Sequence, residues 1–436
     1  MLSIYIYYIV MKNITLEQNH NTTNYRRLKA ITVVISVWSI ISLMHLIPIT
    51  RWFMLVLTLI LTWQAVRMLI AKPKTLINSN EAYLPTVTIL VPAKNESIVL
   101  PNIVESLFHL DYPASHLDIW IINDASTDNT RQRLEKLQSQ FSALQVYHRE
   151  TSGGGKSGAL NAVFGATKGE IILVCDADAQ FHTNFLQQTL PIFQDNTIGA
   201  IQVRKTIANR YINFLTRCQQ MEMICDAWLQ THRIAASGMA ELRGSGMFVR
   251  RQLLEKCNGW NENTVTDDLD LAFRLYIAGA EIEFVTAPAI KEQGVTTLEQ
   301  LWHQRYRWSL GGYQRYLDYL PQMLNLGWKK EIDLLLFLLL QFILPIGLIP
   351  DLLWTVFYTH NAVLLPLQTL LGIILTIGFI AGLYQFQNLR GWSLLWSTLQ
   401  GSFYMLHWIP IMIVTTLSLC IKPQQLNWVK TEHYGN

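Results

Sequence analysis

Charged residues are scarce in this chain of 436 residues. Asp, Glu, Lys and Arg make up 15% of it, whereas an ordinary soluble domain carries about 25%. Hydrophobic residues make up 50%, which excludes a disordered, strongly solvated chain. The formal net charge of +3 is too small to indicate nucleic-acid binding by itself, although a positive bias suits an anionic ligand or a membrane surface. The composition therefore indicates a chain that is partly membrane-embedded and partly globular.

Cysteines are also few, and their spacing matches no metal-binding or redox motif. Five isolated cysteines favour a reducing compartment over a disulfide framework. The first twelve residues lack the basic start and small-residue cleavage site of a signal peptide. We therefore expect residues 1–27 to form an N-terminal extension. The chain has no internal repeat and no low-complexity segment.

The apolar residues gather near the two ends of the chain. Ile31–Ile49 and Trp52–Ile70 each approach the roughly 20 residues that cross a bilayer. A pair of buried core helices is the alternative, but two such runs in close succession favour a transmembrane hairpin over 28–74. Basic residues flank this hairpin on both sides, which predicts that both of its ends lie in the cytosol. They are Arg26, Arg27, Lys29, Arg67, Lys72 and Lys74.

A second apolar block is expected to form the C-terminal transmembrane helices, over 331–421, followed by a tail at 422–436. Ile332–Tyr358 and Ala362–Tyr384 each predict one span. The stretch Trp392–Ile421 is ambiguous, because a single span would export a tail whose lysines favour the cytosol. Pro410 can instead break it into a re-entrant or interfacial pair, so the number of crossings stays open.

Residues 75–297, between the two blocks, have the pattern of a cytosolic globular domain. Short apolar runs predict buried strands at Thr86–Val91, Leu117–Ile122 and Glu170–Asp176. Helical patterns separate them, as at Thr130–Gln140 and Ser157–Thr167. Alternating strands and helices predict an α/β fold, with a parallel sheet covered by helices on both faces. Ligands of such sheets bind at the carboxyl ends of the strands.

Polar motifs stand at those strand ends, each weak alone. Pro92–Glu96 follows the first strand and fits a loop and helix start. Asp124 ends the second strand, where an Asp can accept hydrogen bonds from a base or ribose, although Asp also simply caps helices. The glycine-rich run Ser152–Asn161 fails the Walker pattern, because residue 150 is Glu and residue 151 is Thr. A loop that presents Lys156 to a phosphate and a plain helix-start turn both remain open.

The third strand ends in Asp176 and Asp178. Alternation along a strand puts both carboxylates on one side. Two hard oxygen ligands there suit Mg²⁺ or Mn²⁺ holding a diphosphate, since such ions bind through one or two carboxylates plus substrate phosphates. A capped loop is the alternative.

Three further polar motifs follow: Arg243–Gly246, Thr266–Asp270 and Gln304–Trp308. The acidic cluster can be a charge bias at a helix N-terminus, and Arg305 and Arg307 can be juxtamembrane anchors. The whole set in this order is far less probable by chance than any one member.

This order of motifs resembles the membrane-bound family-2 glycosyltransferases, which have a GT-A fold and include cellulose, chitin and hyaluronan synthases. The resemblance covers about residues 85–320. The chain departs from many members at Asn123 and Asp267, where a second Asp and a Glu are usual. The implied fold is a GT-A domain inserted between transmembrane helices, and the implied activity is inverting transfer from a UDP-sugar.

The resemblance also implies roles for single residues. Asp268 would be the catalytic base, and Asp178, helped by Asp176, would bind Mg²⁺ or Mn²⁺. Lys156 would neutralise diphosphate charge. The implied nucleotide-sugar site consists of Pro92, Ala93, Glu96, Asp124, Lys156, Asp176, Gln304, Arg307 and Trp308.

Longer stretches, at 154–161, 202–205, 241–244 and 311–319, are similar to the β-monoglucosyldiacylglycerol synthases of oxygenic photosynthetic bacteria. This similarity implies UDP-glucose as donor, diacylglycerol in a plasma or thylakoid membrane as acceptor, and no nucleic-acid partner. A processive polysaccharide synthase that uses a UDP-sugar is the alternative, because the number of apolar crossings fits either. A non-catalytic membrane scaffold is disfavoured, since the acidic positions assigned to the metal and to the base are all filled.

Residues 298–330 are expected to form interfacial helices, because they are rich in aromatic and basic side chains and lead into the membrane block. The aromatic residues expected at headgroup depth are Trp302, Trp308, Tyr313, Tyr316 and Tyr319.

Overall fold

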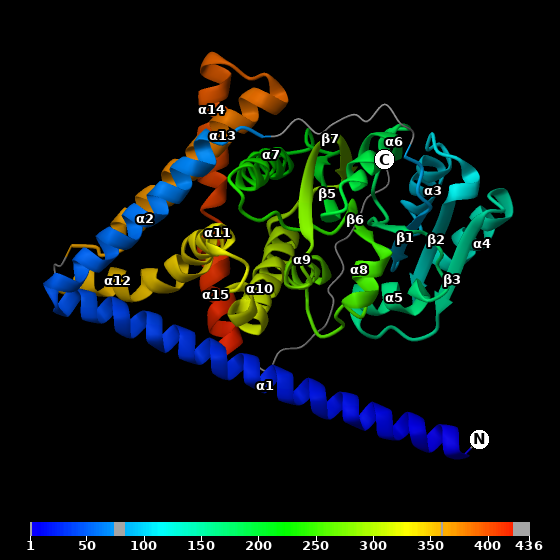
Figure 1. Ribbon diagram of the computed structural model, residues 1–436, viewed down its shortest axis with the longest axis horizontal. Coiled ribbons are helices and arrows are strands. Elements are labelled where there is room, and N and C mark those ends of the chain that lie inside the picture. Colours follow the sequence, from blue (N-terminus) through cyan, green and yellow to red (C-terminus); the bar gives the residue numbers. More distant parts are fainter. Residues whose placement is uncertain (1, 74–82, 359–360, 422–436) are drawn as a thin grey trace.

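The computed structural model describes residues 2–73, 83–358 and 361–421. The expected tail at 422–436 and most of the junction at 74–82 lie outside these ranges. A sheet with its covering helices occupies one side of the molecule, and most of the long helices occupy the other, while the N-terminal helix extends along both (Figure 1).

Within the described residues, seven strands form one sheet, in the order β3-β2-β1-β4-β6-β5-β7. The strands β1 to β4 are parallel, and so are β5 and β7, whereas β6 runs antiparallel to both of its neighbours. The α/β fold is confirmed, with a mixed rather than an all-parallel sheet. The strands are β1 Val87–Ala93, β2 Leu117–Asp124, β3 Leu144–Arg149, β4 Ile171–Val174, β5 Ile198–Ile207, β6 Met247–Arg250 and β7 Glu281–Glu292.

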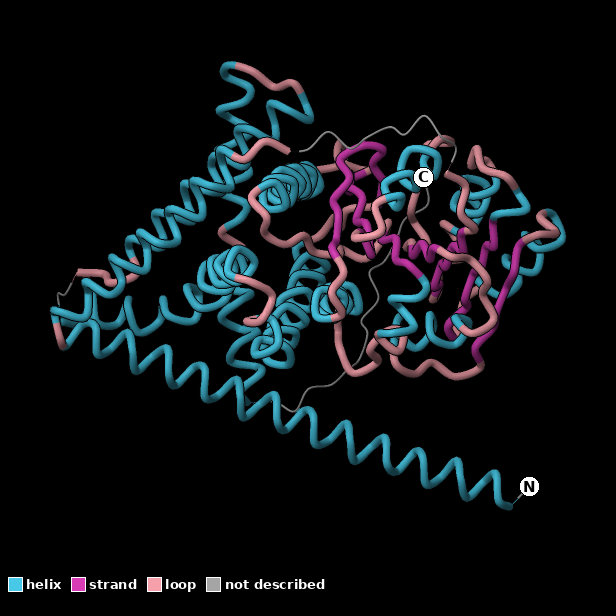
Figure 2. The backbone as a smooth tube through the Cα atoms, viewed as in Figure 1, coloured by secondary structure: helices cyan, strands magenta, loops and turns pink. Residues whose placement is uncertain are grey.

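Helices cover both faces of the sheet, as Figure 2 shows, because neighbouring side chains along a strand point to opposite faces. Ile89 packs in one buried cluster with α3 (Leu100–Phe108) and α4 (Thr130–Gln140). Leu90, the next residue, packs in another with α5 (Gly155–Phe164). Further helices of this part are α6 Phe185–Thr189, α7 Phe214–Ala235, α8 Arg251–Lys256 and α9 Asp267–Ile277.

In the described part of the chain, five helical segments are long and apolar enough to cross a membrane. They lie at Asn24–Leu46, Arg51–Ile70, Trp328–Tyr358, Leu365–Gln387 and Gly391–Ile421. The corresponding elements are the C-terminal half of α1 (Leu2–Leu46), α2 (Arg51–Ile70), α11 (Trp328–Leu338) with α12 (Leu344–Tyr358), α13 (Leu365–Gln387), and α14 (Gly391–Met405) with α15 (Trp408–Ile421). Large apolar side chains are exposed along them, among them Phe53 and Phe403. The protein is therefore an integral membrane protein.

The ambiguous stretch after Trp392 forms two helices rather than one. The helix α14 ends at Met405 and α15 begins at Trp408, just before Pro410. The two helices pack on different partners: α14 lies against α7 and α13, and α15 against α1 and α10 (Leu298–Met323). The break therefore lets α14 contact the sheet domain through α7, while α15 packs on α1 and α10.

The helix α10 (Leu298–Met323) has many of its side chains buried inside the protein. Trp302 is 37% exposed, but Tyr313 and Tyr316 are each only 6% exposed. The ring of Tyr316 packs against Phe273 and Phe342. The rings of Tyr313 and Tyr316 join the sheet domain to the membrane helices, so they face protein side chains rather than lipid headgroups. The depth of α10 in the bilayer stays a prediction.

Candidate active site

One cavity of about 810 Å³ joins the strand ends to the membrane helices. Nine of the sequence-predicted site residues line it: Pro92, Glu96, Lys156, Asp176, Asp178, Asp268, Gln304, Arg307 and Trp308. The first and last of these residues, Pro92 and Trp308, are 216 positions apart along the chain. The fold has therefore brought together almost all of the predicted site residues. Ala93 and Asp124 are not among the lining residues.

Asp124 contacts the chain's own side chains rather than the cavity. Its Oδ1 accepts a hydrogen bond from Arg149 Nη1 and its Oδ2 accepts one from Ser152 Oγ, at 2.5 and 2.7 Å. Arg149 in turn donates to the carbonyl of Gly153 at 2.8 Å. Asp124 therefore anchors the glycine-rich loop. Sequence reasoning missed Arg149, whose only signal is its position at the end of β3.

The glycine-rich loop presents Lys156 to the cavity. Gly154 adopts a φ of 68°, a left-handed conformation that favours glycine, and α5 begins at the next residue. Lys156 Nζ then lies 2.6 Å from Asp176 Oδ1. Burial disfavours the ammonium, but Asp176 and Asp267 outweigh it and raise the pKa of Lys156 above its usual value. Lys156 is therefore a fixed cation at the strand ends.

Asp176 and Asp178 lie in the turn after β4, which ends at Val174 and not at the expected Asp176. Asp178 is buried, and its Oδ2 accepts a hydrogen bond from the backbone N–H of Gln293 at 2.6 Å. Within the described ranges, no group of three or more His, Cys, Asp or Glu side chains could hold a metal ion. The two carboxylates nevertheless fit Mg²⁺ or Mn²⁺ if phosphate oxygens complete the coordination, since these ions prefer oxygen ligands.

Two more carboxylates enter the cavity at the start of α9. Burial, helped by the charges of Asp268 and Asp176 and opposed by that of Lys156, raises the pKa of Asp267 to about 6. The Oδ1 of Asp268 accepts a hydrogen bond from the backbone N–H of Leu269 at 2.8 Å. This bond fixes the side chain at the N-terminus of α9, where the helix dipole favours a negative charge.

Gly244 makes room for the carboxylate of Asp268. Its φ of 79° favours glycine, and a Cβ atom there would lie 3.3 Å from Asp268 Oδ2 and 3.9 Å from Lys156 Nζ. A side chain at this position would therefore crowd the space between the carboxylate and the lysine.

The helix α10 supplies Gln304, Arg307 and Trp308 to the same cavity. Burial lowers the pKa of Arg307, although the nearby charges of Asp176, Asp268 and Asp267 oppose this shift. One face of Trp308 is covered by the guanidinium of Arg305, 4.0 Å from the ring centroid. Arg305 does not line the cavity; it binds the buried Glu222 and orients the motif from behind.

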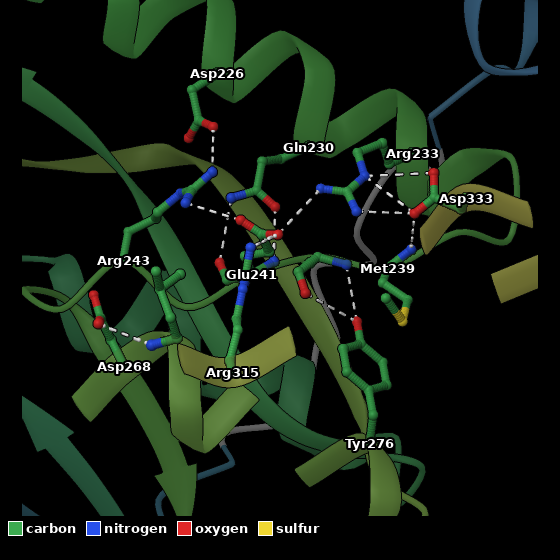
Figure 3. Close-up of polar contacts among 12 residues, drawn as sticks. Asp226, Gln230, Arg233, Met239, Glu241, Arg243, Asp268, Tyr276, Arg315 and Asp333 are labelled. Atoms are coloured by element: carbon green, nitrogen blue, oxygen red, sulfur yellow. Dashed lines mark hydrogen bonds and ion pairs between the residues drawn. The ribbon is translucent and has the colours of Figure 1, made fainter. Parts of the chain in front are cut away.

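A buried ion network lies beside Asp268 (Figure 3). Glu241 is its centre: Oε2 binds Arg243 and Oε1 binds Arg315, both at 2.8 Å, with Arg233 at 3.8 Å. Two outer carboxylates pair with these arginines, Asp226 with Arg243 at 2.8 Å and Asp333 with Arg233 at 2.9 Å. The network ties α7, α10 and the membrane helix α11 to the loop before Gly244. Sequence reasoning missed it, since its members lie on separate elements.

The far end of the cavity is apolar and lies between the membrane helices. It is lined from α11 to α15, and its side chains include Leu340, Leu344, Leu348, Leu371, Ile374, Leu375, Leu406, Ile409 and Met412. The polar end and the apolar end are one continuous space, so a molecule with a polar head and hydrocarbon tails can span both.

Comparison with known proteins decides the family. Residues 85–311, more than half of the chain, match the family described as "Glycosyltransferase like family 2". The chain belongs to the family-2 glycosyltransferases. Nine of the residues that this family resemblance implies for the site line the polar end of the cavity.

Two relatives are similar over nearly the whole length. The "Beta-monoglucosyldiacylglycerol synthase" of Trichormus variabilis is 44% identical over 94% of this chain and 90% of its own. The protein of the same name from Synechocystis sp. is 41% identical over 94% of this chain and 88% of its own.

A solved structure supports the fold. The mannosyltransferase PcManGT from Pyrobaculum calidifontis, solved in complex with GDP-Man and Mn²⁺, superposes with a TM-score of 0.56. The superposition covers 90% of this chain and 99% of the mannosyltransferase chain, and the two sequences are 18% identical. The overall fold is thus shared.

Proposed function

We propose that the protein transfers glucose from UDP-glucose to the hydroxyl of diacylglycerol and forms β-monoglucosyldiacylglycerol with inversion. The observation that carries this proposal is the continuity of the cavity from the carboxylates at the strand ends to the apolar space between the membrane helices. The 44% identity over 94% of the chain to a named β-monoglucosyldiacylglycerol synthase supports the choice of sugar and acceptor.

In this proposal Asp268 removes the proton from the acceptor hydroxyl while that oxygen attacks the anomeric carbon. The N–H of Leu269 holds one carboxylate oxygen, and the gap left by Gly244 keeps the other accessible from the cavity. A single in-line displacement then converts the α-linked donor into a β-glucoside.

Lys156 and Arg307 bring positive charge to the leaving diphosphate, because both line the cavity beside the carboxylates. Pro92 and Glu96 contact the nucleoside, whereas Asp124 supports it through the glycine-rich loop. Mg²⁺ or Mn²⁺ held by Asp178 and Asp176 would supply charge stabilisation of the departing UDP.

The polar end of the cavity faces the cytosol, where nucleotide sugars are made. The basic residues that flank the spans, such as Arg67 and Lys329, support this orientation. Most of the lining between the membrane helices is aliphatic, with Gln341, Gln368, Thr376 and Ser402 interspersed. This mostly aliphatic lining favours hydrocarbon tails over a growing sugar chain, which needs polar groups all along its path.

A partition assay tests the proposal. The purified full-length protein in diacylglycerol-containing micelles is given radiolabelled UDP-glucose or UDP-N-acetylglucosamine in parallel. We expect chloroform-soluble label from UDP-glucose only. Label that stays in an insoluble polymer, or enters lipid from UDP-N-acetylglucosamine alone, would replace this proposal with the polysaccharide synthase or with another transferase.

A further inference from the structure

The motif Arg243–Gly246 begins beside the proposed base, and the transfer steps do not yet use it. Arg243 and Gly244 line the cavity, and so does Asp226 of α7. The side chains of Arg243 and Asp226 are 30% and 29% exposed, so these two charged groups are partly open on the cavity wall. Figure 3 shows Asp226, Arg243 and Asp268 along one side of the ion network.

Arg243 and Asp226 form an ion pair that has hydrogen-bonding capacity left over. Nη2 of Arg243 donates to Oδ1 of Asp226 at 2.8 Å, and Nη1 binds Glu241 Oε2 at 2.8 Å. Within the part of the chain that the structure describes, Nε of Arg243 donates no hydrogen bond and Oδ2 of Asp226 accepts none. Neither atom is among the fully enclosed polar atoms that lack a partner, so a ligand can reach both. The pair therefore offers one donor and one acceptor on adjoining side chains.

Gly244 places this ion pair beside the space for the transferred sugar. A Cβ atom on Gly244 would lie 3.3 Å from Asp268 Oδ2 and 3.9 Å from Lys156 Nζ, so this glycine stands between the proposed base and the lysine assigned to the leaving diphosphate. In an inverting displacement the anomeric carbon lies between the attacking oxygen and the leaving oxygen. Under the proposed function the sugar ring therefore lies beside Gly244, and Arg243, the preceding residue, borders that ring.

A hexose matches the open groups of the pair better than the lipid acceptor does. Each sugar hydroxyl can accept a hydrogen bond from Arg243 and donate one to Asp226. Apart from the hydroxyl that reacts, diacylglycerol carries only ester oxygens, which accept hydrogen bonds and would leave the carboxylate of Asp226 without a donor. A hydroxyl also adds no charge to an ion pair that is already neutral, which favours it over a phosphate.

Groups outside the cavity hold the pair in one arrangement before the donor binds. Glu241, which is buried, binds Arg243 with one carboxylate oxygen and Arg315 with the other, both at 2.8 Å. The backbone N–H of Arg243 donates to Oε1 of the buried Gln202 at 2.6 Å. Because little freedom is lost when a ligand binds such a preorganised pair, Asp226 and Arg243 are suited to distinguish one hydroxyl position from another.

We propose that Asp226 and Arg243 bind a hydroxyl group of the transferred hexose and thereby select the donor sugar. This role rests on the proposed function and adds to it a specificity determinant. The nucleotide and the diphosphate are recognised at the strand ends, whereas the sugar is recognised by this ion pair. The bound hydroxyl takes no part in bond making or breaking, so the pair acts on the choice of donor and on its position.

The test compares UDP-glucose with four analogues that each lack one hydroxyl of the glucose, at C2, C3, C4 or C6. The full-length protein in diacylglycerol-containing micelles is assayed with each donor, and the glycolipid product is measured. For the unaltered protein we expect kcat/KM to be about tenfold or more lower for at least one analogue, as loss of a hydrogen bond to a charged pair implies. Dividing each value by that of a variant removes the intrinsic reactivity of the analogue.

The variant Asp226→Asn keeps the shape of the side chain, but with its amide oxygen toward Arg243 it presents an NH₂ group in place of Oδ2. We expect it to use UDP-glucose and that same analogue with nearly equal kcat/KM, and to keep its preferences over the other analogues and its KM for diacylglycerol. The matched control is Asp333→Asn, because Asp333 is an outer carboxylate of the same network, 2.9 Å from Arg233, and does not line the cavity. The control should keep every preference. If Asp226→Asn does not accumulate in membranes, Asp226→Ser is measured in its place.

Three outcomes would overturn the proposal. The unaltered protein would use UDP-glucose and all four analogues equally, or Asp226→Asn would slow every donor alike and keep the preferences, as a purely structural role requires. A change confined to the KM for diacylglycerol would assign the pair to the acceptor instead. Absence of any glucose transfer to lipid by the unaltered protein would refute the proposed function itself, which is a different failure.

Discussion

The two ends of the cavity are built in opposite ways. At the strand ends, the side chains are fixed by ion pairs and backbone hydrogen bonds, such as Lys156 to Asp176 at 2.6 Å and Asp178 to the N–H of Gln293 at 2.6 Å. Between the membrane helices, the lining residues are mostly aliphatic and are held mainly by packing. The side chains of the polar end are therefore held in one fixed arrangement, whereas the apolar end constrains a bound molecule by little more than its shape.

This difference separates two tasks of a glycosyltransferase. Preorganised charges can stabilise the leaving diphosphate only if they are already in place when the bond breaks. Hydrocarbon tails need only space and freedom from water, since their contacts are non-directional. Changes at the polar end should therefore affect turnover, and changes at the apolar end should affect the use of the acceptor.

Removal of divalent ions should have the largest effect, because Asp176 and Asp178 bring two carboxylates to the diphosphate site. We expect a chelator to abolish transfer, and Mg²⁺ or Mn²⁺ to restore it. Asp178→Ala should lose activity that excess metal does not restore, while Asp195→Ala, an exposed carboxylate outside the cavity, should remain active. Full activity of Asp178→Ala with excess chelator would exclude this metal site.

Asp268→Asn should reduce kcat by a factor on the order of 10² or more, because the amide cannot accept the hydroxyl proton. Binding of UDP, measured by calorimetry, should be retained. The matched variant is Asp267→Asn, the neighbouring carboxylate, which should keep more activity. A larger loss in Asp267→Asn than in Asp268→Asn would move the base to Asp267.

Filling the apolar end should change only acceptor kinetics. Gly372 on α13 lines the cavity, and a Cβ atom there would meet no described atom within 4 Å. We expect Gly372→Trp to raise the KM for diacylglycerol about tenfold, about 1.4 kcal/mol of binding free energy, with an unchanged KM for UDP-glucose.

Its control is Ile373→Trp, because Ile373 is 49% exposed on the outer surface of the same helix and does not line the cavity. Equal effects of the two tryptophans on acceptor KM would show that the apolar end does not receive the tails.

The smallest expected effect is on stability. The pKa of Asp267 is raised to about 6 by burial, so this residue favours the folded state while protonated, and that contribution is lost as pH rises from about 4 through 6. Asp267→Asn should therefore raise the melting temperature by a few degrees at pH 8, with a difference that shrinks toward pH 4. Thermal unfolding in detergent across this pH range checks it. A difference independent of pH would contradict the raised pKa.

The polar end was predictable from sequence because its residues either follow buried strands directly or stand at the start of helices. At such places the local sequence pattern determines where a residue lies in the fold. Thr130–Gln140 was predicted with the bounds that α4 has. Asp124 shows the limit, since no local pattern reveals that Arg149 and Ser152 occupy its carboxylate. The apolar end could not be predicted: Leu340, Leu371 and Met412 become one wall only through the packing of separate helices. The ion pairs of Glu241 with Arg243 and Arg315 are similar, because they join residues from separate elements.

The account's central claim is that the acceptor's tails occupy the apolar end while its hydroxyl reaches Asp268. Photolabelling of the full-length protein in micelles, with a diacylglycerol that carries a diazirine on one acyl chain, tests it most directly. We predict label on the cavity-lining Leu371, Ile374 and Leu375, removed by excess unlabelled diacylglycerol. Label confined to outward-facing residues such as Ile373 and Ile380, unaffected by the competitor, would contradict the claim.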